Sequence, residues 1–148
     1  VYIDKRESSH IVSTYSRVGR RAPMHCTAVG KALLSTMTEE EVLSILKQKG
    51  MSNYTPNTLT EPVKLLKELE RIRNSRIAID YEEYEIGIIC LGTPVFDFSG
   101  RGVGAISVSG PAARIREKGI EHIGQELKRC GDMVSTKLGY KNILKIGT

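Results

Sequence analysis

The chain lacks the features that mark membrane, secreted and cysteine-ligated metal proteins. Its 148 residues contain no apolar run near the roughly 18 residues that span a bilayer. No secretory signal is expected, because the first three residues lead straight into the charged residues 4–7. Three cysteines, Cys26, Cys90 and Cys130, show no C-x-x-C spacing, so neither a disulfide framework nor a zinc site is indicated. We therefore expect a reducing, cytoplasmic setting.

Recognised catalytic motifs are also missing. No G-x-S-x-G elbow occurs, and the pattern of a phosphate-binding loop does not precede Gly30 and Lys31. Cys90 stands between two aliphatic residues and fits a small buried side chain better than a nucleophile. A cysteine-dependent enzyme with His25 as its base remains an alternative, although nothing in the sequence brings the two together. We expect neither enzyme activity nor a cofactor. We also expect no metal site, because His25, Cys26, Asp80 and Cys90 do not have the spacing of metal ligands.

The composition is that of an ordinary globular domain. Hydrophobic residues make up 40% and charged residues 26% of the chain, and the length fits one domain of about 100–200 residues. The net charge of +5 is spread along the chain, and aromatic residues, which would interleave with a nucleic-acid-binding patch, make up only 5%. A solvated basic surface is therefore favoured over direct nucleic-acid binding by this chain.

Capping residues and apolar spacing predict the first helices. Thr27 is a possible N-cap for a short helix with the sequence AVGKALLS. Thr38 and Glu41 form the pattern of a capping box, and Gly50 is expected to end the helix that follows. Thr60 is expected to cap a third helix that has a proline in its first turn.

Strand patterns fall at both ends of this helical region. The expected strands are residues 1–5, 10–15, 77–80, 87–96 and 102–109. The first two would form a hairpin, and a last helix is predicted over residues 120–138, before Gly139. Strands and helices do not alternate as a parallel sheet requires, so the fold class is α+β, with an antiparallel sheet covered by helices.

The two long strands are predicted to carry a small polar cup. With a turn at residues 99–100, Cys90 lies opposite Ser109 and Gly92 lies opposite Ser107. One face of the sheet would then present two hydroxyls, a thiol and the gap left by a glycine. Such a patch suits a small carboxylate or keto acid better than a phosphate, which calls for clustered basic residues.

A plainer interpretation of the same residues stays open. Ser107 and Ser109 could simply face water, because antiparallel sheets often have one wet face. Asp80, which precedes Glu82 and Glu83, is either an acid in a surface turn or a polar group at the rim of the cup.

Three motifs in order resemble those of a known family. They are H-x-x-x-x-G-K-A-L-L from His25, D-x-E-E-x-x-x-G-x-x-C from Asp80, and S-x-S-G-P from Ser107. With the segments around them, they make nearly the whole chain similar to the effector-binding domain of IclR-family bacterial transcriptional regulators. The resemblance implies that residues 1–148 are one such domain with a curved antiparallel sheet, GAF- or profilin-like. The winged helix-turn-helix that binds DNA would lie N-terminal to it and outside this chain, which agrees with the missing initiator Met.

The resemblance also implies a ligand site and partners. The effector would be a small organic or sugar acid. The protein would be a homo-dimer or tetramer that binds DNA only through its N-terminal domain. The implied contacts are the backbone N–H groups of Ala28 and Val29 and the side chains of Asp80, Cys90, Ser107 and Ser109. Two positions depart from the family pattern: Val29 is expected to narrow the pocket, and Arg76, where a glycine is common, to change the end of a helix. The remaining alternative is a purely structural dimerisation module.

Overall fold

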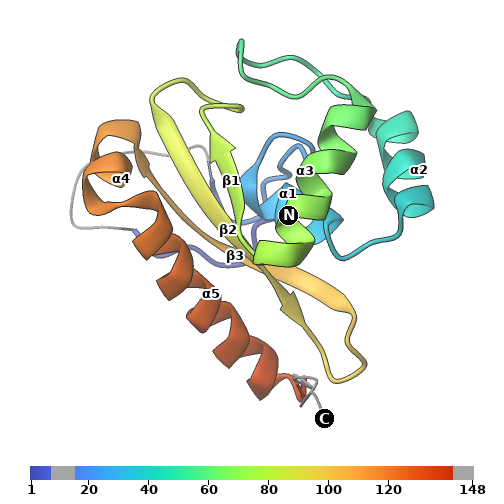
Figure 1. The fold of residues 1–148 in the computed structure, drawn as a ribbon, viewed down its shortest axis with the longest axis vertical. Coiled ribbons are helices and arrows are strands. Elements are labelled where there is room, and N and C mark those ends of the chain that lie inside the picture. The colour runs from blue at the N-terminus through green and yellow to red at the C-terminus, as the bar shows by residue number, and fades with distance from the viewer. Residues whose placement is uncertain (8–15, 142–148) are drawn as a thin grey trace.

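The protein is an antiparallel sheet with helices on both faces (Figure 1). This computed structural model describes residues 1–7 and 16–141. Their elements are α1 (Ala28–Leu34), α2 (Glu39–Lys49), α3 (Pro62–Ser75), β1 (Ala78–Tyr81), β2 (Ile88–Phe96), β3 (Gly102–Pro111), α4 (Ala112–Lys118) and α5 (Ile120–Lys137). The predicted α+β class is confirmed.

The sheet has the order β1-β2-β3, and β2 pairs with both neighbours. Cys90 lies opposite Ser109, and Gly92 lies opposite Ser107, as the sequence predicts. The register shifts only between Val95 and Phe96, near the turn. The predicted pairing therefore holds over the part of the sheet that carries the polar side chains.

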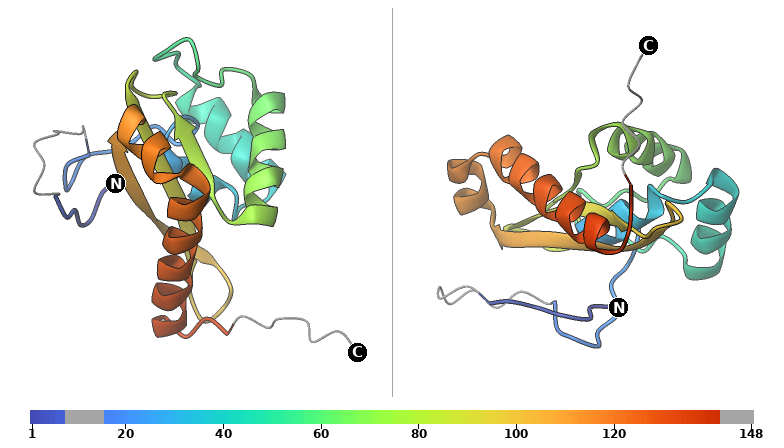
Figure 2. Two further views of the ribbon diagram at one scale, coloured as in Figure 1. Left: turned by 60° about the vertical axis from the view of Figure 1, so that its left-hand side comes forward. Right: turned by 90° about the horizontal axis from the view of Figure 1, so that it is seen from below.

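Close approaches at glycines place the helices on opposite faces of the sheet. A Cβ atom added to Gly131 of α5 would lie 2.6 Å from Thr93, and one added to Gly92 would lie 2.6 Å from the Ala28 carbonyl oxygen of α1. Successive residues of a strand point to opposite faces, so α5 and α1 sandwich β2. Figure 2 shows α5 along one side of the sheet and the N-terminal segment, residues 1–7, beyond the other.

Each helical layer has its own apolar core. The core on the side of α1 to α3 consists of Ala32, Leu34, Val42, Leu46, Leu65, Leu69, Ile72 and Ala78. The core under α4 and α5 consists of Ile89, Leu91, Ala112, Ile115 and Leu127. Helix α4 was not expected, because the sequence of residues 114–118 indicates only a basic surface, and two buried side chains, Ala112 and Ile115, hold it in place.

Helix ends confirm most of the capping predictions. Thr27 accepts a hydrogen bond from the Gly30 N–H, the capping box of Thr38 and Glu41 is formed, and Gly50 ends α2. The prediction for Thr60 is wrong: α3 begins at Pro62, and Glu61 occupies the N-cap position without a side-chain hydrogen bond. Because Thr60 precedes the N-cap, its hydroxyl is not at the position that caps a helix.

The end of α3 also differs from expectation. Arg76 adopts the left-handed conformation itself, with φ at 61°, so the helix ends as it would at a glycine. That backbone costs a non-glycine residue roughly 1–2 kcal/mol. Two contacts of the Arg76 guanidinium offset the cost: an ion pair with Asp132 at 3.0 Å and stacking 4.8 Å from the centre of the Phe96 ring.

The N-terminal segment forms no assigned strand within residues 1–7. Instead, the Tyr2 N–H donates to the Arg20 carbonyl oxygen at 3.0 Å, and the Gly19 N–H donates to the Tyr2 carbonyl oxygen at 2.8 Å. The other half of the predicted hairpin, residues 10–15, lies outside the described residues.

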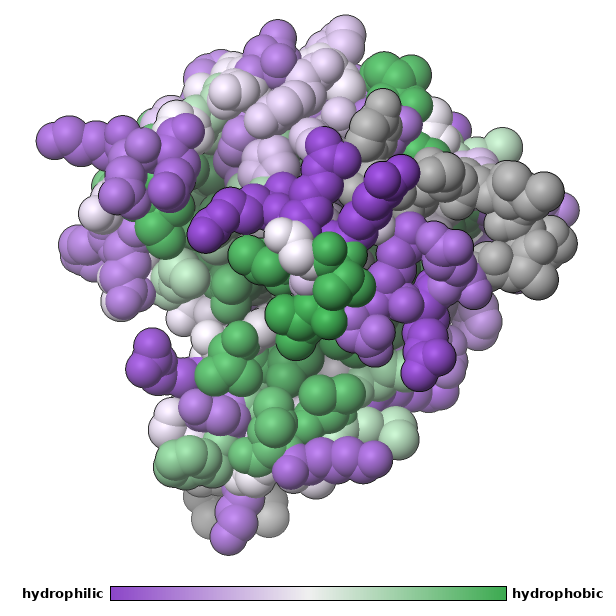
Figure 3. All heavy atoms as spheres, turned by 180° about the vertical axis from the view of Figure 1, so that it is seen from behind, coloured by the Kyte–Doolittle hydropathy of each residue, from purple (hydrophilic) through white to green (hydrophobic). Residues whose placement is uncertain are grey.

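The surface behind the view of Figure 1 is partly apolar. Hydrophobic residues gather through the middle of this face, with polar and charged residues around them (Figure 3). No helix in the part of the chain that the structure describes has the length and apolar character needed to cross a membrane.

Candidate functional site

One pocket brings together all six residues that the sequence singles out. It is lined by Ala28, Val29, Asp80, Cys90, Ser107 and Ser109. Six further residues complete its lining: Tyr2, Ser16, Thr27, Tyr84, Glu85 and Ile88. The cavity volume is about 30 Å³, and about 10–15 Å³ measured in this way holds one water molecule. The space therefore fits a few atoms of a small ligand.

The floor of the pocket is a row of polar side chains across the sheet. Asp80 of β1 lies opposite Cys90 of β2, and Cys90 lies opposite Ser109 of β3. Ser107 is on the same face, two residues before Ser109, and both serines are exposed. The glycine gap expected beside them is absent, because the Ala28 backbone fills the space over Gly92. This glycine makes room for α1 and does not line the pocket.

Short-range contacts fix the start of α1 at the pocket wall. The Thr27 hydroxyl donates to the Pro23 carbonyl oxygen at 2.6 Å and accepts from the Gly30 N–H at 3.2 Å. The first N–H groups of a helix have no acceptor within it. Those of Ala28 and Val29 find none among the described residues, so both remain for a ligand.

Asp80 is buried, so the interpretation as a surface turn acid is wrong. Its side chain is folded into its own turn, where Oδ1 accepts from the N–H groups of Glu83 at 2.8 Å and Tyr84 at 3.3 Å. Burial raises the pKa of Asp80 to about 6, against the effect of these hydrogen bonds. The carboxyl group therefore changes charge close to physiological pH.

Cys90 is a poor nucleophile in this setting. Burial, followed by the nearby Asp80 charge, raises the pKa of its thiol to about 12. A protonated thiol is a weak hydrogen-bond donor, and the thiolate is the form that attacks. His25 does not line the pocket, and its Nε2 lies 2.9 Å from the Ser52 carbonyl oxygen. The structure therefore does not assemble the pair that a cysteine enzyme would need.

Residues that could bind a metal are not clustered. Across residues 1–7 and 16–141, no group of three or more His, Cys, Asp or Glu side chains is placed to hold an ion. Cys26 is fully buried, and burial raises the pKa of its thiol to about 12.

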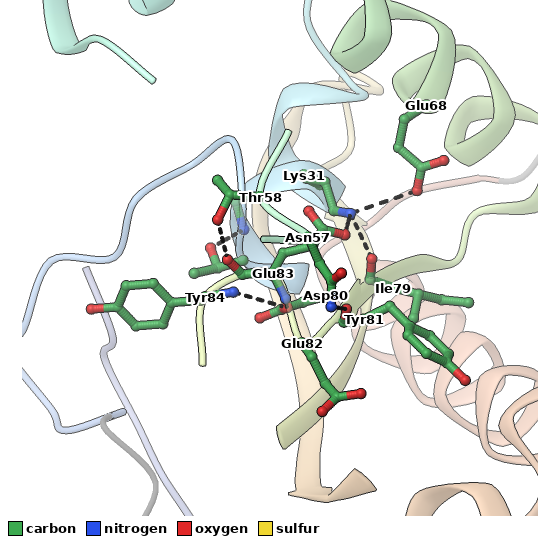
Figure 4. A network of polar contacts seen from close by, with 12 residues as sticks. Lys31, Asn57, Thr58, Glu68, Ile79, Asp80, Tyr81, Glu82, Glu83 and Tyr84 are labelled. Atoms are coloured by element: carbon green, nitrogen blue, oxygen red, sulfur yellow. Dashed lines mark hydrogen bonds and ion pairs between the residues drawn. The ribbon is translucent and has the colours of Figure 1, made fainter. Parts of the chain in front are cut away.

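A buried ion pair beneath the pocket was missed by the sequence analysis. Lys31 Nζ lies 2.5 Å from Glu83 Oε1 and 2.5 Å from the Ile79 carbonyl oxygen, with Glu68 Oε1 at 3.7 Å (Figure 4). Burial raises the pKa of Glu83, although Lys31 acts in the opposite direction. The signal for this pair is a lysine within the otherwise apolar helix AVGKALL, where a charge needs a partner.

A loop before α3 holds the turn that carries Asp80 and Glu83. The Thr58 hydroxyl donates to the Glu83 carbonyl oxygen at 2.6 Å, and the Thr55 hydroxyl donates to that of Glu82 at 2.7 Å. Glu82 has a φ of 58°, a strained backbone that these bonds help to maintain. The position of the Asp80 carboxylate thus depends on α1, β1 and this loop together.

The charge of the pocket is negative rather than positive. Its described lining includes two carboxylates, Asp80 and Glu85, and neither lysine nor arginine. The ammonium group of Lys31 lies nearby but is held by Glu83 and Ile79. A bound anion would therefore depend on hydroxyl and backbone N–H donors.

Comparisons with known proteins agree on one family. The model of the bacterial transcriptional regulator IclR C-terminal domain matches residues 1–136. The HTH-type transcriptional repressor AllR of Salmonella typhi is 38% identical over 141 residues, which cover 95% of this chain and 52% of that protein. This chain thus spans about half the length of the curated relatives it matches.

Solved structures are similar over most of the chain. The crystal structure of the Thermotoga maritima IclR is 42% identical with a TM-score of 0.89, over 95% of this chain and 57% of that one. The inducer-binding domain of a PobR double mutant from Acinetobacter, in complex with 3-hydroxybenzoic acid, is 27% identical with a TM-score of 0.78. That match covers 86% of this chain and 74% of the other. The chain belongs to the family of C-terminal domains of IclR-type bacterial transcriptional regulators.

Proposed function

We infer that this domain senses a small organic or sugar acid and thereby modulates DNA binding by an N-terminal winged helix-turn-helix domain of the same protein. The observation that carries the proposal is that Ala28, Val29 and four polar side chains of the sheet line one pocket. Ligand binding would favour one quaternary arrangement over another and so shift an equilibrium. A cytoplasmic location is part of this proposal.

The donors of the pocket support an acid as the ligand. Hydroxyls of Ser107 and Ser109 and the free N–H groups of Ala28 and Val29 can donate to a carboxylate. Asp80 can accept from a hydroxyl at the other end of the same molecule. The ligand of one relative, the PobR domain, is 3-hydroxybenzoic acid, which has both a carboxyl and a hydroxyl group. Val29 in the wall would limit the size of the acid.

The two alternatives have less support. A cysteine enzyme would need an activated thiol, but burial raises the pKa of Cys90 to about 12, and His25 faces Ser52. A purely structural dimerisation module would not need a polar row of Asp80, Cys90 and Ser109 around an open pocket.

A homo-dimer or tetramer is the expected assembly. The support is the number of large apolar side chains left exposed in the chain as described, among them Ile3 at 88% and Phe98 at 80%. Exposed apolar surface commonly marks a protein interface. Sedimentation of the purified protein as a monomer, with and without ligand, would contradict this part of the proposal.

A thermal-shift screen of small acids tests the ligand. Pyruvate, lactate, gluconate and 3-hydroxybenzoate make a suitable panel, and an acid at about 100 times its Kd stabilises the protein by about 2.7 kcal/mol. Ser107→Ala should weaken the effect, whereas Ser44→Ala, a matched change on the exposed side of α2, should not. If no acid raises Tm, the proposed ligand class is wrong.

A further inference from the structure

We propose that Tyr2 is both the lid of this pocket and a contact residue for its ligand. The inference rests on the proposed function for the contact, but the lid is a property of the fold alone. Tyr2 lines the pocket and belongs to residues 1–7, a segment that lies beyond one face of the sheet in Figure 2. It thus faces the row formed by Asp80, Cys90 and Ser109.

The backbone around Tyr2 is held in place on both sides. Its N–H donates to the Arg20 carbonyl oxygen at 3.0 Å, and its carbonyl oxygen accepts from the Gly19 N–H at 2.8 Å. Residues 17–20 form a turn in which the Arg20 N–H donates to the Arg17 carbonyl oxygen at 3.0 Å. Two backbone hydrogen bonds therefore tie the lid to the turn at residues 17–20.

The side chains of this segment alternate between water and the pocket. Val1 is 69% and Ile3 is 88% exposed, whereas Tyr2 between them is partly buried. Such alternation is the pattern of extended backbone. The segment thus turns one ring inward and leaves its two aliphatic neighbours outside.

The Tyr2 hydroxyl is available to donate a hydrogen bond to a ligand. Within the described residues the Tyr2 hydroxyl forms no hydrogen bond, and buried phenol groups usually find a partner. Burial, followed by Cys90, Tyr84 and Asp80 in that order, raises the pKa of Tyr2 to about 12, so the hydroxyl stays a donor. A ligand between lid and floor would accept from Tyr2 on one side and from the serines on the other.

Thiol modification of Cys90 tests the lid without any ligand. In a Cys130→Ser background, methyl methanethiosulfonate can reach Cys90 through the pocket that this residue lines, and fully buried Cys26 reports unfolding as a second adduct. Tyr2→Ala should speed the single adduct several-fold, because the ring no longer covers the route from solvent to the Cys90 thiol. Tyr2→Phe should not change the rate. Tyr140→Ala, a ring deletion beside Phe96, is the matched control and should also leave it unchanged. An unchanged rate in Tyr2→Ala would overturn the lid.

Calorimetric titration with pyruvate and lactate tests the contact. Tyr2→Phe should raise the Kd about three- to tenfold, the range that one net hydrogen bond supplies. If the acids bind, and Ser107→Ala weakens their binding while Tyr2→Phe does not, the proposed function stands and the Tyr2 contact is overturned. If neither acid binds the wild type but Tyr2→Ala still speeds Cys90 modification, the lid stands, and both the contact and this ligand class fail.

Discussion

The Lys31 ammonium group lies 2.5 Å from the Glu83 carboxylate in a site where the Lys31 side chain is 1% and the Glu83 side chain 9% exposed. This pair joins α1 to the turn after β1 and thus couples the two elements that carry the Ala28 and Asp80 sides of the pocket. Glu83 Oε2 has no hydrogen-bond partner in the described structure, so the charge of Lys31 is its principal compensation. The geometry of the pocket therefore depends on an ion pair that does not line it.

Removal of the lysine should destabilise the protein strongly. Lys31→Met leaves a buried carboxylate without its counter-ion, and loss of one partner of a buried pair costs about 3–5 kcal/mol. Urea unfolding of the variant should show this loss, and Lys31→Met combined with Glu83→Gln should recover part of it. The control is Lys64→Met, which breaks the exposed pair with Glu61 and should change stability by less than about 1 kcal/mol. Equal effects of the two lysine variants would contradict the prediction.

Short-range signals explain what the sequence predicted. The Thr27 cap, the capping box of α2 and the pairing of Cys90 with Ser109 each depend on residues close together in the chain or on one turn. Period-two alternation then places Ser107 with Ser109 on one face. The floor of the pocket follows from these local rules.

Long-range contacts explain what the sequence could not predict. Lys31 and Glu83 are separated by 52 residues, and no local pattern pairs them. Tyr2 reaches the pocket because its backbone bonds to residues 19 and 20, which no spacing rule connects to it. Asp80 looked like a surface acid for the same reason, since its buried position lies in a pocket with residues distant in the chain, among them Ala28 and Tyr2.

A methyl group at Gly92 should displace α1. The added Cβ would lie 2.6 Å from the Ala28 carbonyl oxygen and 2.8 Å from its carbon, both backbone atoms that cannot rotate away. Overpacking of this kind costs about 1–3 kcal/mol. Gly92→Ala should lower the urea midpoint and weaken acid binding together, because Ala28 lines the pocket. Gly104→Ala on β3 meets no atom within 4 Å and should leave acid binding intact, so a similar loss there would contradict the argument.

The raised pKa of Asp80 should make stability depend on pH. The carboxyl group ionises near 3.8 when unfolded but at about 6 when folded, so the wild type loses stability as pH rises through this window. Asp80→Asn keeps an acceptor for the N–H groups of Glu83 and Tyr84 and removes the titration. As pH rises from 4 to 7, the free energy of unfolding of this variant should increase relative to that of the wild type by up to about 3 kcal/mol, since a shift of two pKa units corresponds to about that much.

Asp97 supplies a control of opposite sign. Hydrogen bonds, first from the Ser99 side chain, lower the pKa of this exposed carboxyl. Its contribution to stability is present above the unfolded pKa and is lost as pH falls, so Asp97→Asn should lose stability relative to wild type as pH rises from the acid range. Parallel pH trends in the Asp80 and Asp97 variants would contradict the assignment.

Acid binding should be tighter at pH 6 than at pH 8. Even when the ligand hydroxyl faces Asp80, the ligand carboxylate shares a small pocket with Asp80 and Glu85 and disfavours the ionised form of Asp80, so the complex holds more protons than the free protein. Tyr2, Tyr84 and Cys90, which also face this space, remain protonated over that range, because the pKa of each is raised. Calorimetric titration of lactate in two buffers of different ionisation enthalpy should show that binding takes up as much as about one proton. The affinity should increase by as much as about tenfold for each unit by which the pH is lowered. Lactamide, the uncharged analogue, and Asp80→Asn should each remove the pH slope. An affinity for lactate that rises with pH would contradict this prediction.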